Sequence, residues 1–509
     1  MYYILEGHNN VYDIQTITQI FFPNEGFIRA EQFDMQGLTA VSTLTPAECR
    51  GALYKDGSMM RESVYPLPEN ENNHRMRHEH NHLQAEGLIT HTPVTDRITG
   101  SQEIRRRLMI ALFLACRAYT GQNPPWGALT GIRPSKMARM LLEKGYTRTK
   151  IIDAIERNYL VRKDKISLAL DVAAVENEVL KKDRKDAFSL YVGIPFCPSR
   201  CLYCSFASYP AGEDSGMADT YMDALERELR AVRSLTRRQK VSAVYVGGGT
   251  PTSLNEKQLD RLLALIKSLF GNSEEFDVEA GRPETLNLNK MRILKNYGVS
   301  RISLNPQSLN DETLIRIGRN HTVNDFYKSF ALARDQGFDN INTDIILGLP
   351  GEAQTHCAHT MNKLLELKPE NLTVHILTIK RASLLREALE RYPLPCVSAL
   401  GEMIEISQRR CRESGLIPYY MYRQKNMLGN FENVGYCQPG KQSLYNILIM
   451  EETQTIWAAG AGAISKLVFG DKLTRVFNVK SLRDYITRID EMIKRKEVWQ
   501  NAVSDTAGY

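Results

Sequence analysis

The sequence predicts an α/β protein: a parallel sheet covered by helices, preceded by an α+β and helical extension and followed by a small C-terminal region. Two observations predict this class. From Phe188 onward, short apolar runs alternate with amphipathic segments of helical period, a pattern typical of a parallel sheet. Before Phe188, short extended runs come first and a series of helical segments follows.

The bulk composition is that of a globular protein in a reducing compartment. The 509 residues are 43% hydrophobic and 24% charged with a net charge of +6, which does not indicate a nucleic-acid-binding protein. The first residues lack a secretory signal, and the longest apolar run, Leu108–Cys116, is too short to cross a bilayer. We therefore predict a cytoplasmic protein without a membrane span. Six of its nine cysteines are scattered singly and are interpreted as core residues.

Residues 1–95 are predicted to form an α+β region. Its extended runs are expected at Phe27–Glu31, Leu38–Leu44 and Arg61–Val64, and its helix at Tyr12–Phe22. The polar segment Pro66–His82 contains His74, His78, His80 and His82. A solvated loop is favoured there over a metal site, because no periodicity fixes the four imidazoles.

Residues 96–182 are predicted to be helical. Apolar residues recur at helical spacing in Glu103–Tyr119, Ser135–Lys144, Thr149–Asn158 and Ile166–Leu180. The Gly- and Pro-containing segment Gly127–Pro134 is expected to be a loop. The charged segment Lys181–Asp186 is interpreted as a linker to the next region.

Residues 183–385 are predicted to contain the sheet, and residues 386–509 the C-terminal region. Strands are expected at Leu190–Pro195, Ala243–Gly247, Phe276–Ala280, Arg301–Leu304, Asn342–Leu347 and Leu372–Leu377. Helices are expected between them at Ala218–Arg237, Asn255–Phe270, Asn289–Tyr297, Asp311–Ile317, Val323–Gln336 and Ala353–Leu367. A flat doubly wound sheet and a curled partial barrel both suit this order. In either, the loops after the strands carry the chemistry.

Three clustered cysteines follow the first of these strands. Cys197, Cys201 and Cys204 have the spacing C-x3-C-x2-C, short enough for three thiolates to surround one cubic iron–sulfur cluster. Three ligands leave one iron open, and an open position lets a metal bind a small molecule. A zinc site or a ferredoxin-type cluster would need a fourth ligand, and none follows within the loop. We therefore predict a 4Fe–4S cluster that chelates S-adenosylmethionine and initiates radical chemistry.

Glycine and polar residues lie at the ends of the later strands. Gly247–Thr252 ends the second strand, where its glycines allow close approach to the backbone and its successive N–H groups can face a ligand's carboxylate. Glu279 ends the third strand, Gln307 and Arg319 follow the fourth, and Asp344 lies in the fifth. Structural hydrogen bonding would explain any one of them, but their shared location favours a common site. His321, His356, His359 and His375 are more simply interpreted as core or surface residues.

Together these residues resemble the radical-SAM coproporphyrinogen III oxidase superfamily over about residues 188–470. Later segments agree, namely Pro418–Tyr420, Asn433–Tyr436 and Ala459–Ser465. The long N-terminal region, Gly127–Pro134, Cys204–Pro210 and Tyr422–Asn426 look most like the HemZ-type oxygen-independent coproporphyrinogen III oxidases. The resemblance implies a curled (β/α)6 barrel and oxidative decarboxylation of two propionates of coproporphyrinogen III, which yields protoporphyrinogen IX in haem biosynthesis. An unidentified electron donor is also implied.

The same resemblance implies which residues contact the cofactors. Cys197, Cys201 and Cys204 would ligate the cluster. The S-adenosylmethionine contacts would be Tyr191, Tyr203, Gly248, Gly249, Thr250, Glu279, Gln307, Arg319 and Asp344. The last three resemble positions that contact S-adenosylmethionine, including a second molecule of it, in the family's best-defined enzymes. No catalytic side chain is assigned.

Two positions depart from the family pattern. Gly193 stands where the family usually has histidine, and Phe206 stands where the established decarboxylases have a further cysteine. The haem-chaperone branch also has phenylalanine at the second position. A haem-binding delivery protein without decarboxylase activity is therefore the alternative hypothesis, and a radical enzyme with another substrate is a third.

Overall fold

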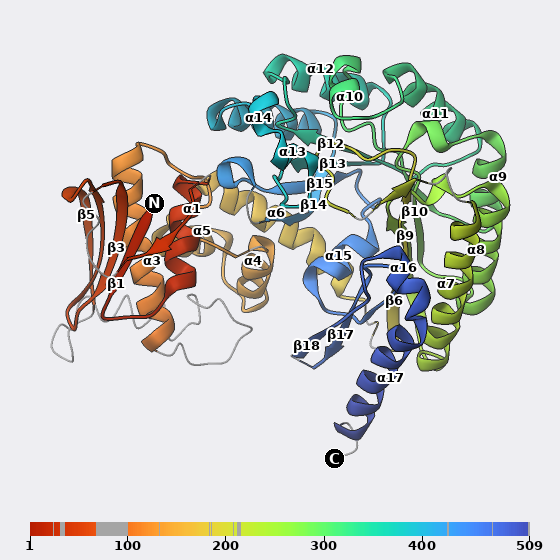
Figure 1. The fold of residues 1–509 in the computed structure, drawn as a ribbon, viewed down its shortest axis with the longest axis horizontal. Coiled ribbons are helices and arrows are strands. Elements are labelled where there is room, and N and C mark those ends of the chain that lie inside the picture. The colour runs from red at the N-terminus through yellow and green to blue at the C-terminus, as the bar shows by residue number, and fades with distance from the viewer. Residues whose placement is uncertain are drawn as a thin grey trace. The chain divides into compact units, whose positions relative to one another are not determined.

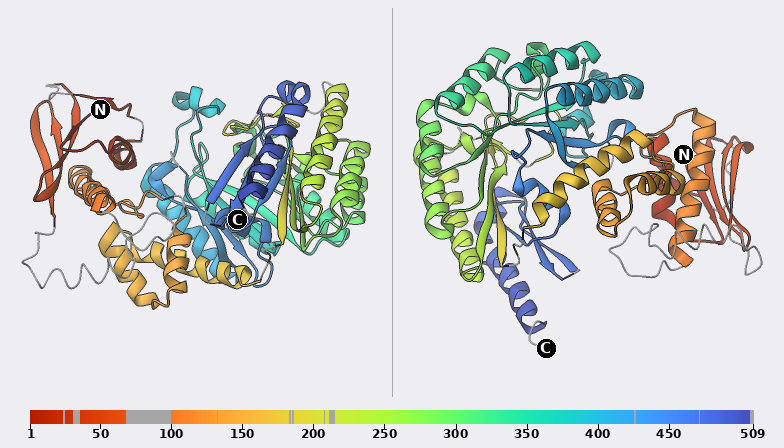
Figure 2. Two further views of the ribbon diagram at one scale, coloured as in Figure 1. Left: turned by 90° about the horizontal axis from the view of Figure 1, so that it is seen from below. Right: turned by 180° about the vertical axis from the view of Figure 1, so that it is seen from behind.

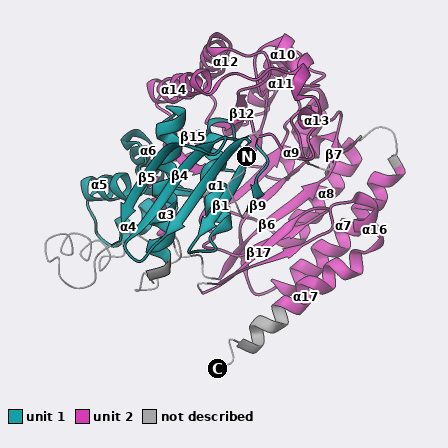
Figure 3. Ribbon diagram, turned by 60° about the vertical axis from the view of Figure 1, so that its left-hand side comes forward, with its two compact units in different colours: residues 1–174, 422–432 teal, residues 175–421, 433–509 magenta. Residues whose placement is uncertain are grey.

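A computed structural model describes residues 1–23, 25–30, 36–67, 100–131, 133–182, 184, 186–206, 208–210, 215–424, 427–470 and 472–506. The chain divides into two compact units (Figure 3). Unit 1 comprises residues 1–174 and 422–432, and unit 2 comprises residues 175–421 and 433–509. The four histidines of the predicted loop at Pro66–His82 lie outside the described residues. No helix among the described residues is long and apolar enough to span a membrane.

Unit 1 contains a five-stranded sheet in the order β2-β1-β3-β4-β5. The strands are β1 (Tyr2–Glu6), β2 (Ile28–Arg29), β3 (Leu38–Leu44), β4 (Glu48–Lys55) and β5 (Ser58–Pro66). The helices α1 (Val11–Phe21) and α3 (Gly100–Thr120) bury their apolar residues against it, with the rings of Phe21 and Phe113 5.0 Å apart. The sequence pattern did not predict β1 and β4. In β4, a Cβ at Gly51 would lie 2.4 Å from the backbone nitrogen of Leu112, so glycine permits the close approach of α3.

Three further helices complete the predicted helical series. They are α4 (Pro134–Glu143), α5 (Arg148–Tyr159) and α6 (Lys163–Leu180). Residues 422–432 join unit 1 through Glu432, which accepts hydrogen bonds from Trp126 Nε1 at 2.7 Å and Lys165 Nζ at 2.6 Å. This carboxylate is fully buried, and hydrogen bonds such as these offset the cost of its burial.

Unit 2 is built on an eleven-stranded sheet in the order β14-β15-β13-β12-β11-β10-β9-β6-β16-β17-β18. Its centre is the predicted parallel series: β6 (Ala187–Ile194), β9 (Lys240–Gly248), β10 (Glu275–Glu279), β11 (Arg301–Ser303), β12 (Ile341–Leu347) and β13 (Asn371–Ile376). The sheet curls into an open barrel with helices on its outer side (Figures 1 and 2). The predicted α/β partial barrel is therefore confirmed, and the flat alternative is wrong.

The helices between the parallel strands also agree with the prediction. They are α7 (Ser215–Leu235), α8 (Glu256–Phe270), α9 (Leu288–Asn296), α10 (Asp311–Arg316), α11 (Val323–Asp335) and α12 (Gln354–Glu366). Side-chain capping fixes where α8 begins, because Asn255 accepts from the Gln258 amide while Gln258 accepts from the Asn255 amide. The apolar face of α8 is then buried, including Leu259, Leu262 and Ile266.

The C-terminal part of the chain extends both edges of the sheet. β15 (Asn433–Cys437) pairs antiparallel with β13, and β14 (Ile417–Tyr422) lies beyond it. At the other edge, β16 (Ile456–Ala459) pairs parallel with β6 and leads into the hairpin of β17 (Ile464–Phe469) and β18 (Lys472–Phe477). The accompanying helices are α13 (Leu384–Glu387), α14 (Val397–Glu413), α15 (Leu444–Glu451), α16 (Leu482–Thr487) and α17 (Ile489–Thr506).

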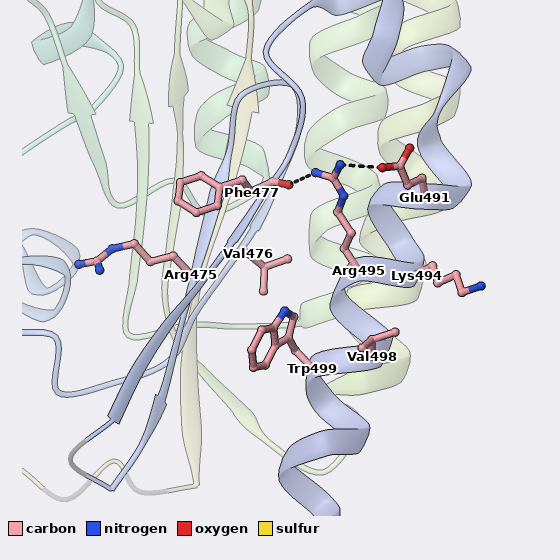
Figure 4. A pocket seen from close by; sticks show the side chains of 8 residues that line it. All are labelled: Arg475, Val476, Phe477, Glu491, Lys494, Arg495, Val498 and Trp499. Atoms are coloured by element: carbon pink, nitrogen blue, oxygen red, sulfur yellow. Dashed lines mark hydrogen bonds and ion pairs between the residues drawn. The ribbon is translucent and has the colours of Figure 1, made fainter.

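Two features of α17 involve residues outside the predicted site. Its Lys496 donates to the buried carboxylate of Glu228 on α7 at 2.6 Å, and Glu228 also accepts from Tyr485 Oη and the Gly460 amide. On its outer side, α17 and β18 form a groove of about 450 Å³ (Figure 4). Across it, Arg495 donates to the Phe477 carbonyl at 2.6 Å. None of the predicted site residues lines this groove.

Candidate active site

The cysteine loop begins where β6 ends. Its first part forms β7 (Phe196–Cys197), which pairs with β8 (Tyr209–Pro210). Further along, the Leu202 amide donates to the Ile317 carbonyl at 2.9 Å, and the Leu385 amide donates to the Leu202 carbonyl at 2.9 Å. The loop is thus held between the end of α10 and the start of α13, and its conformation is fixed by backbone hydrogen bonds.

The three thiols of the loop are free of disulfides and lie near one another. Cys197 Sγ is 3.5 Å from Thr250 Oγ1, and Cys201 Sγ accepts a hydrogen bond from Arg282 Nη1 at 2.9 Å. Burial raises the pKa of Cys197 to about 11, although its hydrogen bond with Thr250 favours the thiolate. The neighbouring Cys204 and Cys201 add to this rise. Buried, clustered thiols of this kind become thiolates when a cationic group binds them.

The glycine segment at the end of β9 fits closely against the cysteine loop. A Cβ at Gly249 would lie 2.5 Å from the Phe196 carbonyl oxygen and 3.0 Å from Cys197 Sγ, so only glycine fits there. The Gly249 and Thr250 amides donate to the carbonyls of Ile194 and Phe196 at 2.7 Å. The Gly248 amide bonds to the Glu279 carboxylate. The sequence pattern suggested that these N–H groups could face a ligand's carboxylate; these three amides are instead bonded within the protein, where they shape the site.

Glu279 ends β10 beside a stack of three tyrosine rings. The Tyr245 and Tyr445 rings are stacked with centroids 4.5 Å apart, and Tyr191 stacks on Tyr245 at 6.1 Å. The Tyr245 hydroxyl donates to Glu279. Burial raises the pKa of Glu279 to about 7, and the nearby Asp344 charge also raises it. Hydrogen bonds from Tyr245 and Gly248 oppose this rise. Glu279 therefore changes its charge near neutral pH.

Gln307 and Asp344 meet between β11 and β12. The Gln307 amide donates to the Asp344 carbonyl at 3.0 Å, and Gln307 has a left-handed φ of 68°. Asp344 accepts from Asn342 Nδ2 at 2.8 Å, and its Oδ2 is 3.7 Å from His375 Nε2. Burial opposes ionisation of Asp344, but His375, Asn342 and Thr373 together hold its pKa below the ordinary value. Asp344 therefore has the partners that the sequence analysis required of it.

Arg319 and Tyr203 join the cysteine loop to the fourth strand. Arg319 is buried, donates to the Asn305 carbonyl and bonds to the Tyr203 hydroxyl. Two buried atoms of the site have no protein partner within the described residues, namely Arg319 Nε and Gln307 Oε1. These are polar groups that a bound ligand would satisfy.

Comparison with known proteins agrees with this geometry. Residues 191–364 match the radical SAM superfamily. The "oxygen-independent coproporphyrinogen-III oxidase-like protein HemZ" of Bacillus subtilis is 38% identical over 412 residues, covering 78% of this chain and 82% of that protein. The chain belongs to the HemZ-like family of radical SAM proteins.

Two further relatives of this HemZ-like protein have different names. The "heme chaperone HemW" of Bacillus subtilis is 34% identical over 308 residues, covering 60% of this chain and 76% of that protein. The solved structure of the radical SAM enzyme coproporphyrinogen III oxidase (HemN) of Escherichia coli superposes with a TM-score of 0.51 at 25% identity. That likeness covers 63% of this chain and 73% of HemN.

Membership of the superfamily means that this HemZ-like protein uses a 4Fe–4S cluster and S-adenosylmethionine. The cysteine loop suits the cluster. Within the part of the chain that the structure describes, no three His, Cys, Asp or Glu side chains converge on a single ion. In a cubic cluster each thiolate binds its own iron atom, so three thiolates spread along a short loop are what it requires.

The structure adds three residues that the sequence analysis did not select for the site. Arg282 lies three residues after Glu279, and Tyr245 lies two residues before Gly247, so both share the strand ends already singled out. Tyr445 had no such signal. It reaches the stack because Glu275 on β10 accepts from the Leu444 and Tyr445 amides and from Ser443 Oγ, which anchors the start of α15.

The structure also shows the surroundings of the two residues that depart from the family pattern, Gly193 and Phe206. A Cβ at Gly193 would make ordinary contacts of 3.4 Å or more, so the local packing does not require glycine. The Phe206 side chain, just beyond the cysteine loop, is 65% exposed. Phe206 therefore takes little part in the core of the described residues.

Proposed function

We propose that this HemZ-like protein is an oxygen-independent coproporphyrinogen III dehydrogenase that converts two propionates of coproporphyrinogen III into the vinyl groups of protoporphyrinogen IX. One observation carries the proposal. The relative named as coproporphyrinogen-III oxidase-like matches 78% of this chain, whereas five relatives named as haem chaperones match 54–60% and two named as coproporphyrinogen III oxidases match 36%.

The residues of the site have distinct tasks in this proposal. When bound, the cluster supplies the electron that cleaves S-adenosylmethionine and starts hydrogen abstraction from a propionate β-carbon. Glu279 and the Tyr191 ring hold the adenosyl part, and Gly248, Gly249 and Thr250 shape the floor beneath it. Tyr203, Gln307, Arg319 and Asp344 contact S-adenosylmethionine from the side of the fourth and fifth strands. The cofactor is thereby oriented and water is excluded.

A second candidate function is haem delivery without decarboxylation. The observation that favours it is Phe206, which stands where established decarboxylases have cysteine and whose side chain is exposed. A flat aromatic side chain in this position suits a tetrapyrrole plane. A tetrapyrrole ligand is common to both candidates, while the fate of its propionates separates them.

An anaerobic turnover assay tests the proposal. The cluster is reconstituted, and the protein is given a reductant, S-adenosylmethionine and coproporphyrinogen III. The expected result is 5′-deoxyadenosine, CO2 and protoporphyrinogen together. A Cys201→Ala variant is the matched control and should release none of the three.

The products decide between the candidates. Deoxyadenosine without protoporphyrinogen or CO2 contradicts the dehydrogenase assignment. Stoichiometric haem binding with no turnover supports the delivery protein instead. A Phe206→Ala variant refines the result: weaker haem binding with unchanged deoxyadenosine release would place the phenylalanine at the tetrapyrrole.

A further inference from the structure

We propose that Arg282 sets the reduction potential of the cluster by donating a hydrogen bond to the sulfur of Cys201. The Nη1 atom of Arg282 lies 2.9 Å from Cys201 Sγ, and the arginine side chain is buried. Within the described residues, no other arginine, lysine or histidine nitrogen is hydrogen-bonded to the sulfur of any of the three loop cysteines.

The guanidinium is held rigidly in this position. Its Nη2 donates to Ser199 Oγ at 2.6 Å, and its Nε donates to Glu284 Oε1 at 2.9 Å. Ser199 in turn donates to the Gly318 carbonyl at 2.9 Å, and Glu284 is bonded to His321 Nδ1 at 3.0 Å. Each of the three guanidinium nitrogens therefore has its own partner: Nε and Nη2 donate to side-chain oxygens, and Nη1 donates to the sulfur.

The second arginine of the site does not take this role. Arg319 donates to the carbonyl of Asn305 and bonds to the hydroxyl of Tyr203. Its charge reaches the cysteines only through space, whereas Arg282 makes direct contact. The two positions differ enough for their effects on the cluster to be separated by mutation.

A cation at a cluster sulfur favours the reduced state. Reduction adds one negative charge to the cluster, and a buried guanidinium stabilises that charge more than solvent-exposed groups do. Hydrogen bonds to the sulfurs are among the determinants of cluster potential. Arg282 thus makes the electron transfer that precedes cleavage of S-adenosylmethionine more favourable. This inference does not depend on which tetrapyrrole, if any, is the substrate.

The experiment is a potentiometric titration of the reconstituted protein, followed by electron paramagnetic resonance of the reduced cluster. Arg282→Gln keeps hydrogen-bonding capacity but removes the charge. Arg282→Lys keeps the charge but loses the planar guanidinium, whose nitrogens donate in three fixed directions. Arg261→Gln is the matched control, because Arg261 is an exposed arginine of the same unit that pairs with Asp223 and Glu226 on the outer helices.

We expect Arg282→Gln to lower the equilibrium constant for reduction about tenfold, a potential more negative by about 59 mV for one electron. Arg282→Lys should fall between this value and the wild type, and Arg261→Gln should equal the wild type. Iron content and circular dichroism are measured for each variant.

Several results would overturn the inference. One is a glutamine variant with full iron content and the wild-type potential. Another is a glutamine variant that is folded but holds no cluster, because Arg282 would then be required for assembly and not for tuning. If the glutamine variant does not fold, the lysine variant decides, and a wild-type potential in it refutes the proposal. Catalytic activity is not needed for any of these readouts.

Discussion

At the scale of single residues, Glu279 combines burial with a pKa of about 7. Its carboxyl is mostly protonated below that pH and mostly ionised above it. If the ionised form binds S-adenosylmethionine, affinity should rise about tenfold between pH 6 and pH 8. Equilibrium dialysis with the cluster-loaded, oxidised protein at three pH values measures this.

Glu279→Gln is the control for that titration. The amide cannot ionise, so the variant should bind weakly and lose most of the rise with pH. If wild type and variant showed the same pH dependence, the titrating group would lie elsewhere, for example on the ligand.

Gln307 offers a second test, because its backbone and its side chain have different tasks. Its φ of 68° is costly for any residue with a Cβ, by about 1 kcal/mol. Gln307→Gly should therefore keep or slightly raise stability while weakening binding of S-adenosylmethionine, since the amide with the unmatched Oε1 is removed. Urea denaturation and equilibrium dialysis check the two halves of the prediction.

Gln307→Ala separates these contributions further. It removes the same amide but keeps the backbone strain, so it should bind as weakly as the glycine variant and be less stable than it. A glycine variant that binds like the wild type would remove Gln307 from the list of cofactor contacts.

At the scale of elements, the cysteine loop makes the clearest prediction. Cys201→Ala should abolish normal cluster assembly, because two thiolates remain where three are needed. Iron analysis and the visible absorption of the reconstituted protein measure the loss. Cys396→Ala is the control, since Cys396 is an exposed free cysteine and should be dispensable. Unchanged iron content in the Cys201 variant would contradict the ligand assignment.

The parallel strands and their helices were predictable because each carries its own periodicity. The apolar run at 342–347 predicts a strand and the amphipathic run at 256–270 predicts a helix, without reference to the rest of the chain. β4 was missed because Gly51 interrupts its pattern, and the reason for that glycine is the backbone of α3, which lies far away in the sequence. Tyr445 was missed for a similar reason. Its position depends on Glu275, which lies far away in the sequence and accepts a hydrogen bond from the Tyr445 amide.

At the scale of the whole molecule, the strand order could not be obtained from local patterns. The sheet does not stop at the six predicted strands: β15 pairs with β13 at one edge, and β16 pairs with β6 at the other. Such pairings depend on long-range contacts rather than on the composition of either strand. The cysteine loop, in contrast, could be found early because its ligands are close together in the sequence.

The C-terminal helix contributes to stability through one buried ion pair. Lys496 and Glu228 have side chains that are 1% and 0% exposed. Lys496→Met would leave the Glu228 carboxylate buried without its cation, and we expect a loss of about 3 kcal/mol in the free energy of unfolding. Urea denaturation measures it. Lys494→Met, an exposed neighbour on the same helix, should change stability little, and equal losses in both variants would refute the assignment.

The segment 422–432 has a consequence for how this architecture can change in evolution. Because these eleven residues belong to unit 1, the chain passes between the two units three times. Removing residues 1–174 would take away Trp126 and Lys165, the hydrogen-bonding partners of Glu432. A shorter protein with the same barrel would therefore expose the Glu432 carboxylate to solvent and leave segment 422–432 without the rest of its own unit. Gain or loss of the N-terminal region thus affects two separate stretches of the chain and not one terminus alone.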